Sequence, residues 1–543
     1  MNNIDLILIA KSEMLDYNKY KALPYDRIEL FRDLTQLKMV YFENGFRSQL
    51  DLLNRAMFGK YFYDVDYAER AKMFSTWNMQ SLNPYLALTP LINDGFSCKV
   101  ILNLDAEFDK LLKYTESQEK KYIAVSTTFM LTFAEVSRVV KKIKASIPDA
   151  IIILGGAFIN DNFGSKKLDY IKSLKKYGIN YVLTAFNSEF DFLDLMKTLR
   201  QNSSLDKVNN LIYLDNDTEY KITQEKWNEP NLEQSPIPWD KIEFDTNVSM
   251  IQMRTTSGCP FTCSFCTYPV SANGYHKDEP ELILRPQLEK LKKLGHIKSI
   301  IFIDDTPNIP QKRFEKILDI LKDYDFRWYS FLRVQYIDDN IARKMKESGC
   351  DGVYLGIESA DDEVLKNMNK AATRKKYEKG IALLNKYSIE SLVAFIIGFP
   401  GETRESVANN ISFIAENKIN FYSLKEFFYM HTAPIHAKKE KFELDGWGNN
   451  WSHKTMNSIE ASKLKLESYD SMKQSLYVDA DTSLWYLAYL RDMGFSWPDI
   501  KGIQAILNEM MQLDNLDKFD CLEKEELFAK LKNIVDKLPR PTD

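Results

Sequence analysis

The sequence contains few residues that bind metals or form disulfides: six Cys and five His in 543 residues. Cys98, Cys350 and Cys521 lie far apart, so no disulfide framework is indicated, and unpaired thiols fit a reducing cytoplasm. A structural zinc site usually takes four Cys or His ligands at short spacings. No fourth Cys lies near the clustered Cys259, Cys263 and Cys266, and His276 has no second His within a few residues of it in the sequence. A zinc-binding scaffold protein is therefore disfavoured.

Long hydrophobic runs and an excess of one charge are also missing. The chain has 72 basic and 77 acidic residues, a net charge of −5, which gives no general attraction to nucleic acid or anionic lipid. No apolar run is long enough to cross a bilayer. The first ten residues lack the basic start and cleavage site of a signal peptide. We expect a cytoplasmic protein without nucleic-acid or membrane partners.

The apolar fraction of 45% is ample for large cores, and the length suggests two to four domains. In residues 1–205, apolar runs alternate with amphipathic segments, which predicts βαβ units and a doubly wound α/β domain with a helical insertion near residues 11–80. Residues 206–247 read as a polar linker with a short hairpin at 211–213 and 219–222. Strands are expected at 5–10, 97–103, 122–128, 150–154 and 181–184, and helices at 82–93, 132–146, 165–177 and 188–200.

Residues 248–430 predict a second α/β domain, a partial (β/α)6 barrel with its chemistry at the carboxyl ends of the strands. Residues 431–543 predict a helical cap on the substrate side. The expected barrel strands are 250–254, 297–303, 327–332, 352–357, 392–397 and 421–427. The expected helices are 281–294, 311–324, 338–348 and 404–417 in the barrel, and 458–470, 484–493, 500–511 and 524–537 in the cap.

Three thiols lie within eight residues, Cys259, Cys263 and Cys266, at a CxxxCxxC spacing directly after the first barrel strand. Clustered thiolates favour iron–sulfur clusters or zinc. A cubic iron–sulfur cluster usually takes four thiolates, so three would leave one iron open for chemistry. We expect this loop at the active end of the barrel.

The spacing, with Phe265 before the last Cys, resembles the signature of the radical S-adenosylmethionine (radical SAM) enzymes. The segments 356–359, 366–370 and 397–402 resemble the branch of that family with cobalamin domains. The resemblance implies a [4Fe–4S] cluster on the three Cys, with SAM chelating the open iron. It implies reductive cleavage of SAM to a deoxyadenosyl radical that attacks an unactivated C–H bond, and an electron donor such as flavodoxin or ferredoxin.

Polar residues at the ends of the other barrel strands are candidate SAM contacts. Carboxylates after the second strand could accept hydrogen bonds from the ammonium group of SAM, or could equally form a helix N-cap or turn. An arginine after the third strand could pair with the carboxylate of SAM or a ribose oxygen. An acid and a hydroxyl after the fourth strand face ribose, and a glycine after the fifth admits the adenine ring. These candidates are, in order, Asp304 and Asp305, Arg333, Glu358 and Ser359, and Gly398.

The N-terminal half resembles the cobalamin-binding domain of these enzymes, through the segments 122–128 and 152–157. The resemblance places Ser126, Thr127, Gly155 and Gly156 against the nucleotide tail of cobalamin. A DxHxxG motif, which would supply a lower cobalt ligand, is missing. The glycine-rich segment of the family is Ala185–Glu189 here, and Phe186 would crowd the tail.

The leading interpretation is therefore cobalamin-dependent methyl transfer to an unreactive carbon, or to phosphorus, of a small molecule or peptide. The alternative is a cobalamin-free radical SAM epimerase, cyclase or rearrangement enzyme. An epimerase often uses a Cys thiol as hydrogen donor; Cys350 is expected to be a packed core residue, and Cys521 stays open for that role.

Overall fold

The computed structural model describes residues 4–12, 39–76, 79–116, 118–130, 132–163, 171–215, 219–229, 236–242, 248–278, 281–472, 474–478, 484–516, 518 and 521–537. Its contacts group into two compact units. Unit 1 comprises Met1–Asp16, Trp77–Val248 and Lys277–Gly295, and unit 2 comprises Tyr17–Thr76, Ser249–His276 and His296–Asp543. No helix within the described ranges is long and apolar enough to cross a membrane.

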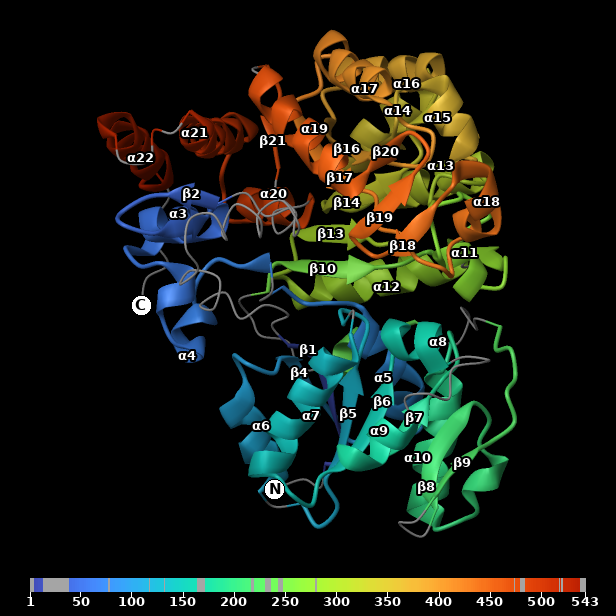
Figure 1. The fold of residues 1–543 in the computed structure, drawn as a ribbon. Helices are drawn as coiled ribbons and strands as arrows, with labels where there is room; N and C mark the ends of the chain where they lie inside the picture. The colour runs from blue at the N-terminus through green and yellow to red at the C-terminus, as the bar shows by residue number, and fades with distance from the viewer. Residues whose placement is uncertain are drawn as a thin grey trace. The chain divides into compact units, whose positions relative to one another are not determined.

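Unit 1 contains a seven-stranded sheet in the order β4-β1-β5-β6-β7-β8-β9 (Figure 1). The first five strands in this order pair in parallel, and β8 and β9 continue the sheet as an antiparallel hairpin. The predicted doubly wound sheet is confirmed. The hairpin that the sequence placed in a linker instead extends this sheet. The strands are β1 (Leu6–Lys11), β4 (Cys98–Asn103), β5 (Tyr122–Ser126), β6 (Ile151–Gly155), β7 (Ile179–Leu183), β8 (Leu211–Asp215) and β9 (Glu219–Ile222).

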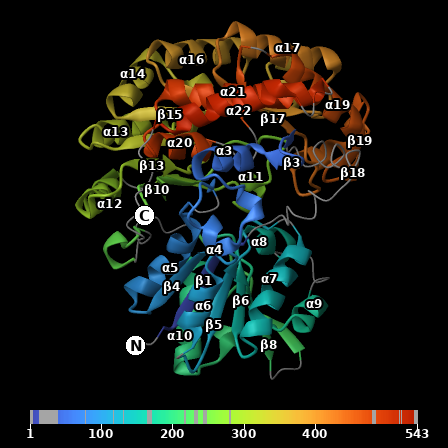
Figure 2. The same ribbon diagram turned by 90° about the vertical axis from the view of Figure 1, so that its left-hand side faces the viewer.

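Helices cover both faces of this sheet because successive strand residues point to opposite sides. Ile7 and Ile9 pack in one core with α7, whereas Leu6 and Leu8 pack in the other with α5 and α10 (Figures 1 and 2). The helices are α5 (Asn83–Asn93), α6 (Phe108–Thr115), α7 (Phe133–Ser146), α8 (Ala157–Phe163), α9 (Ile171–Lys176), α10 (Glu189–Gln201) and α12 (Glu281–Leu294). Of these, α6 and α8 were not predicted. The helix α12, which the sequence placed in the barrel, belongs to unit 1 by its contacts.

Unit 2 contains seven parallel strands in the order β10-β13-β14-β15-β16-β17-β21. The six predicted barrel strands are confirmed, and β21 is a short seventh. Trp328 packs on Phe314 and Phe395 on Phe413, so one face of the sheet meets the helices. The strands are β10 (Met250–Met253), β13 (Ser299–Phe302), β14 (Arg327–Leu332), β15 (Cys350–Glu358), β16 (Glu390–Ile397), β17 (Phe421–Glu426) and β21 (Leu476–Tyr477); the helices are α13 (Gln311–Leu321), α14 (Asp339–Glu347), α15 (Asp362–Asn367), α16 (Arg374–Lys386) and α17 (Arg404–Glu416).

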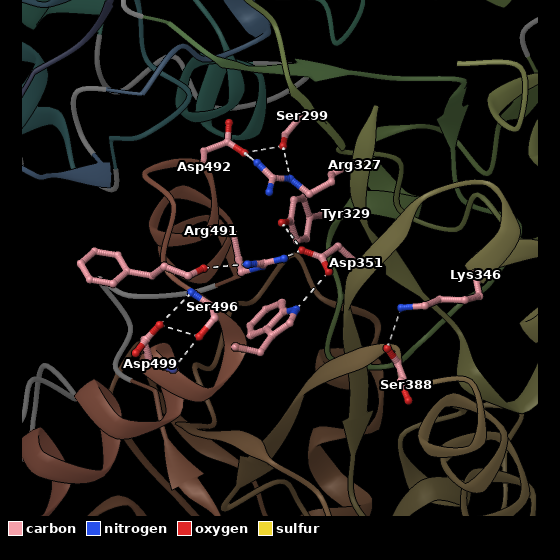
Figure 3. Close-up of polar contacts among 12 residues, drawn as sticks. Ser299, Arg327, Tyr329, Lys346, Asp351, Ser388, Arg491, Asp492, Ser496 and Asp499 are labelled. Carbon is pink, nitrogen blue, oxygen red and sulfur yellow. Dashed lines mark hydrogen bonds and ion pairs between the residues drawn. The ribbon is translucent and has the colours of Figure 1, made fainter. Parts of the chain in front are cut away.

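The chain that follows β17 contacts the unit 2 sheet both at the carboxyl ends and at the amino ends of its strands. Three short strands, β18 (Asp445–Trp447), β19 (Asn450–His453) and β20 (Met456–Asn457), form a small sheet before α19 (Ser458–Ser471). Lys465 of α19 forms a buried ion pair of 3.0 Å with Glu426, the last residue of β17. In contrast, α20 (Leu484–Asp492) contacts the starts of β13, β14 and β15 through Arg491 and Asp492 (Figure 3). Only the first part of the predicted cap therefore lies at the carboxyl ends of the strands.

The segment 39–76, which the sequence placed in an insertion of the first domain, belongs to unit 2 by its contacts. Its helix α3 (Gln49–Phe58) packs on α22 (Leu522–Val535). Gln504 of α21 (Trp497–Asn515) donates a hydrogen bond of 3.0 Å to Gln49, and Lys524 donates one of 2.8 Å to the backbone of Tyr41. These buried polar contacts join the segment 39–76 to the C-terminal helices α21 and α22 within unit 2.

Candidate active site

The loop Cys259–Cys266 begins just beyond β10 and β11 (Thr256–Gly258), so the prediction that it lies past the first barrel strand is confirmed. Backbone hydrogen bonds fasten it to two other segments at the same end of the sheet. The Ser264 N–H donates to Met368 O, and the Ile435 N–H donates to Ser264 O, both at 2.8 Å. Because these segments follow β15 and β17, the loop is fixed over the carboxyl ends of the strands.

A glycine is required where the chain enters this loop. Gly258 has a φ of +82°, and a Cβ there would lie 1.8 Å from the carbonyl oxygen of Tyr275. No other residue could bring the two backbone segments so close. The turn that presents the cysteines thus depends on Gly258, which the sequence analysis did not single out.

The three thiols occupy one neighbourhood. Cys263 is buried and accepts a hydrogen bond of 2.9 Å from Arg333, and the sulfur of Cys259 lies 3.3 Å from the Thr306 hydroxyl. Burial, with a smaller contribution from the neighbouring charges of Cys263 and Cys259, raises the pKa of Cys266 to about 11. Within the described ranges, no three His, Cys, Asp or Glu side chains stand in metal-binding geometry. The donor set nonetheless suits a soft, sulfur-ligated metal centre.

Arg333 supports the cysteine loop. One terminal nitrogen donates to Cys263, and the other donates to the carbonyl of Lys370 at 2.8 Å. Its guanidinium also lies 3.5 Å from the ring centre of Phe261, a favourable cation–π distance. A positive group thus stands where a thiolate would carry negative charge. The predicted contact of Arg333 with SAM stays a prediction, because its hydrogen bonds here go to protein atoms.

Glu358 ends β15 in the left-handed region, with a φ of +65°. Its carboxylate forms an ion pair of 3.0 Å with Lys370, and both side chains are largely buried. A Cβ at Gly356 would lie 2.5 Å from the Glu358 carboxylate, so a larger residue there would displace this side chain. Lys370, to which the sequence analysis gave no role, therefore joins Arg333 and Glu358 in one polar group beside the loop.

The neighbouring acids Asp304 and Asp305 behave differently. Asp304 is buried, and its Oδ1 accepts hydrogen bonds from the backbone N–H groups of Thr255 and Thr256, so it fixes the turn between β10 and β11. Asp305 keeps an exposed face, yet loss of surrounding water raises its pKa to about 7. Of the pair, only Asp305 presents its side chain outward.

Ser359 and Gly398, which were predicted to contact SAM, contact other protein groups in the structure. Ser359 is fully buried, and its hydroxyl lies 3.3 Å from the side-chain oxygen of Asn410. Gly398 has a φ of +91°, and a Cβ there would lie 2.4 Å from the indole of Trp451. His453 makes a hydrogen bond of 3.0 Å to the Gly398 carbonyl. The sequence analysis did not single out Trp451 or His453, and nothing in their spacing pointed to this contact.

Glu402 is a buried acid beside Gly398. One oxygen accepts the Gly398 N–H, and the other accepts a hydrogen bond of 3.1 Å from Asn410. Burial raises the pKa of Glu402 to about 8. The folded state therefore holds this proton more tightly than the unfolded state, whose carboxyl has an ordinary pKa near 4.5.

This shift predicts a loss of stability with rising pH. Between about pH 4.5 and 8 the unfolded chain releases the proton of Glu402 while the folded chain retains it, so the free energy of unfolding falls across this window. Glu402→Gln removes this titration. The difference in unfolding free energy between the variant and the wild type should thus shift in favour of the variant from pH 5 to pH 8, as measured by urea denaturation. A pH-independent difference would contradict the assignment.

In unit 1, some of the residues predicted to contact cobalamin instead form hydrogen bonds or close packing contacts within the protein. Thr127 is fully buried; its hydroxyl donates to Gly155 O at 2.9 Å and accepts from the Ile159 N–H at 3.3 Å. A Cβ at Gly156 would lie 2.9 Å from the Thr127 nitrogen, so this glycine permits close packing of two loops. Ser126 and Gly155 stay half-buried at the strand ends. Gly156 is half-buried as well, so Thr127 is the one predicted contact that the fold buries completely.

Phe186 is held by a segment that follows β9. Its ring stacks on Trp227 with an interplanar angle of 10°. The adjacent Asn187 and Asn228 exchange hydrogen bonds of 3.0 and 2.8 Å, and Asn228 also donates to Asp191 at 2.6 Å. The aromatic side chain beyond β7 is therefore part of an ordered stack.

The Radical SAM superfamily matches residues 253–414. An uncharacterized methyltransferase, PH0819, of Pyrococcus horikoshii is 26% identical over 352 residues, which cover 62% of this chain and 73% of that protein. The bacteriochlorophyllide d C-12(1)-methyltransferase of Chlorobaculum tepidum is 31% identical over 176 residues, 32% of this chain and 39% of that protein. The second match thus spans about two fifths of the relative.

Solved structures share the fold across most of the chain. The radical S-adenosylmethionine methyltransferase TsrM from Kitasatospora setae, with cobalamin and a [4Fe–4S] cluster bound, has a TM-score of 0.55 at 15% identity, covering 81% of this chain and 75% of that one. The cobalamin-dependent S-adenosylmethionine radical enzyme OxsB, with aqua-cobalamin bound, has a TM-score of 0.53 at 12% identity, covering 84% and 76%. At these identities the likeness establishes the fold.

Proposed function

From the premise that residues 253–414 form a radical SAM domain, we propose that this protein is a cobalamin-dependent radical SAM methyltransferase. It methylates an unactivated carbon, or a phosphorus centre, of a small molecule or peptide. The observation that carries the proposal is the cysteine loop, fastened over the carboxyl ends of the parallel strands with Arg333 hydrogen-bonded to Cys263. Enzymes built on such sheets place their chemistry at this end.

Cys259, Cys263 and Cys266 would hold a [4Fe–4S] cluster and leave one iron for SAM. When bound, the cluster supplies the electron that cleaves SAM to methionine and a radical able to remove a hydrogen atom. Arg333 offsets negative charge at Cys263 and braces the loop against Lys370. Asp305, with its outward side chain, is the better placed of the two acids to accept hydrogen bonds from an ammonium group. The buried Glu358–Lys370 pair holds its carboxylate in one orientation.

Cobalamin is proposed for unit 1 because of its parallel sheet and its likeness to TsrM and OxsB, which were solved with cobalamin and aqua-cobalamin bound. In open α/β sheets, ligands bind beyond the carboxyl ends of the strands. Ser126 and Gly155 lie there with accessible faces. When bound, cobalamin would supply the methyl group. The residues of unit 1 would supply a surface that keeps the cofactor from water and fixes its orientation.

A second function is favoured by one observation, the stack of Phe186 on Trp227 beyond β7. If this stack fills the place of the cofactor tail, the enzyme performs radical chemistry without cobalamin, such as epimerisation, cyclisation or rearrangement. Cys350 does not suit the role of hydrogen donor, because it is buried at the start of β15, the end of the strand remote from the cysteine loop. Cys521 keeps partial exposure and stays a candidate.

The proposal includes a reductant and a compartment. An electron donor such as flavodoxin or ferredoxin would supply the electron, and a cytoplasmic location would keep the cysteines reduced. All six cysteines are free thiols in the structure, as expected in a reducing compartment.

The proposal predicts that anaerobic reconstitution with iron, sulfide and hydroxocobalamin gives about four irons and about one cobalt per chain after gel filtration. Addition of SAM and dithionite should then release methionine and 5′-deoxyadenosine. Phe186→Gly serves as the comparison. Four irons with cobalt retained only by this variant would favour the cobalamin-free function for the wild type. Zinc without iron would contradict both functions.

A further inference from the structure

The inner face of the unit 2 sheet, which points away from the helices, keeps solvent-accessible surface. Neighbouring strands in register place Phe331 beside Tyr354, and Tyr354 beside Leu392. Phe331 and Tyr354 are only half-buried, whereas Trp328, Ser330 and Leu332 on the other positions of β14 are buried. A strand in the middle of a sheet is half-buried on one face only if that face borders accessible space. The inner face is therefore a candidate place for the substrate.

Aromatic rings form the floor of this face. Phe331 lies 5.1 Å from the ring of Tyr354, with a 61° angle between them. Trp485, from the start of α20, lies 5.1 Å from the ring of Phe331, with a 55° angle between them. These are the separations of edge-to-face aromatic contacts. Three rings from three elements are thus in contact in series, a cluster suited to a further unsaturated ring packed in the same tilted manner.

Two buried polar atoms on this face have no partner in the part of the chain that the structure describes. They are the indole nitrogen of Trp485 and the hydroxyl of Ser423. Ser423 is 3% exposed, and register with Ala394, which pairs with Gly356, puts it on the same face as Tyr354. Buried polar groups in native proteins almost always form hydrogen bonds. An N–H and a hydroxyl left open here point to a ligand with oxygen or nitrogen acceptors.

A positively charged residue, Arg254, lies level with Phe331 across the sheet. Arg254 directly follows β10, and the register Met253 to Phe302 to Ser330 places its backbone level with Phe331, two strands away. Neighbouring strands are about 4.8 Å apart, so the two backbones lie about 10 Å apart. The Nε of Arg254 is buried without a hydrogen-bond partner among the described residues. A guanidinium in this state is suited to a carboxylate, which it can bind in a bidentate manner.

We propose that this inner face binds the substrate as a flat, unsaturated ring system bearing a carboxylate, with the ring on Phe331, Tyr354 and Trp485 and the carboxylate on Arg254. The proposal deepens the proposed function, on which it rests, by naming the substrate class of the same active site. SAM also carries a carboxylate, so the shared chemistry at Arg254 is carboxylate binding, and the test has to separate the two sources.

The test uses small probes and the oxidised, reconstituted protein. Indole-3-propionate carries both a flat ring and a carboxylate, indole-3-propionamide lacks the charge, and cyclohexanepropionate lacks the flat ring. Saturation-transfer NMR gives the affinity of each. We expect the wild type to bind indole-3-propionate about tenfold or more tightly than either of the others, as for a hydrogen-bonded charge. Arg254→Met should bind the two indoles alike, and Arg254→Lys should keep part of the preference.

Arg404→Met is the matched control, because Arg404 pairs with Glu467 on the exposed surface; it should behave as the wild type. A preference for the carboxylate that survives in Arg254→Met would overturn the proposal, as would no binding of either indole or equal binding of cyclohexanepropionate. Calorimetry with SAM completes the test. Unchanged SAM affinity in Arg254→Met supports the proposal, whereas loss of SAM affinity with an intact probe preference assigns Arg254 to SAM and overturns it. Probe binding needs no turnover, so failure of the proposed function, seen as no release of 5′-deoxyadenosine, is distinguishable.

Discussion

Cys263→Ala is expected to reduce cluster iron to background after reconstitution and to abolish release of methionine and 5′-deoxyadenosine from SAM. A cubic cluster that already lacks a fourth thiolate has few ligands to lose. Cys263 is also the thiol most closely built into the fold, because it is buried and hydrogen-bonded to Arg333 at 2.9 Å. The measurement is iron and sulfide content together with the 400-nm absorbance region, followed by product analysis.

Cys521→Ser is the control for that experiment, since Cys521 is half-exposed and precedes α22, far in sequence from the loop. It should retain iron and SAM cleavage. A Cys263→Ala protein with normal iron would show that the three cysteines do not hold the cluster.

Arg333→Met provides an intermediate case. It removes the charge and the bond to Lys370 but no ligand, so we expect cluster iron to be retained in part and lost faster under a chelator.

The sequence predicted the strands well because each barrel strand is a short apolar run between amphipathic helices. β14 was placed at its observed limits, and α12 likewise. The cysteine loop was also predicted, since its spacing and its position after a strand are both local features. In contrast, β21 has only two residues, too few to leave a periodic pattern. Its existence depends on pairing with β17, a contact that no local signal records.

The contacts inside the site were harder to predict because they join residues far apart in the chain. The bond from Arg333 to Cys263 spans 70 positions, and the contact of Trp451 with Gly398 depends on how the chain returns after β17. The position of a polar residue at the end of a strand indicates that it lies near the site. It does not indicate whether the side chain binds a ligand or stabilises the fold. Asp304 illustrates the difference. The sequence paired it with Asp305, yet its hydrogen bonds show that it closes a backbone turn.

The position of α20 also escaped sequence analysis, for the same reason. Its amphipathic pattern predicted a helix and its place in the chain suggested a cap near the substrate. The polar network at the C-terminal end of α20 places that end of the helix at the amino ends of the strands (Figure 3), while Trp485 at its start contacts Phe331 on the inner face. Asp492 accepts hydrogen bonds from Ser299 and from Ser249, the latter at 2.9 Å, and pairs with Arg327 at 2.7 Å. These partners begin β13, precede β10 and begin β14, so the carboxylate joins the amino ends of three strands.

Asp492→Ala is therefore expected to lower the free energy of unfolding by about 3 kcal/mol, the cost of removing one partner of a buried ion pair. The side chain of Asp492 is fully buried, while that of Arg327 is one-third exposed, so the arginine left behind can recover part of its hydration and the lower end of the usual range applies. Urea denaturation measures the change. Glu467→Ala is the control, because its pair with Arg404 is exposed on both sides and such pairs contribute at most about 1 kcal/mol.

The same variant separates a structural from a catalytic role. Because Asp492 lies at the opposite ends of the strands from the cysteine loop, Asp492→Ala should retain cluster iron and SAM cleavage at a temperature well below its unfolding transition. Residues at this end of a β/α barrel act on stability, whereas residues at the carboxyl ends act on chemistry. Loss of SAM cleavage in a protein of unchanged stability would refute this division, and with it the assignment of α20 to the floor of the barrel. Loss of stability with intact chemistry would support a structural role for Asp492 and the assignment of the chemistry to the opposite, carboxyl ends of the strands.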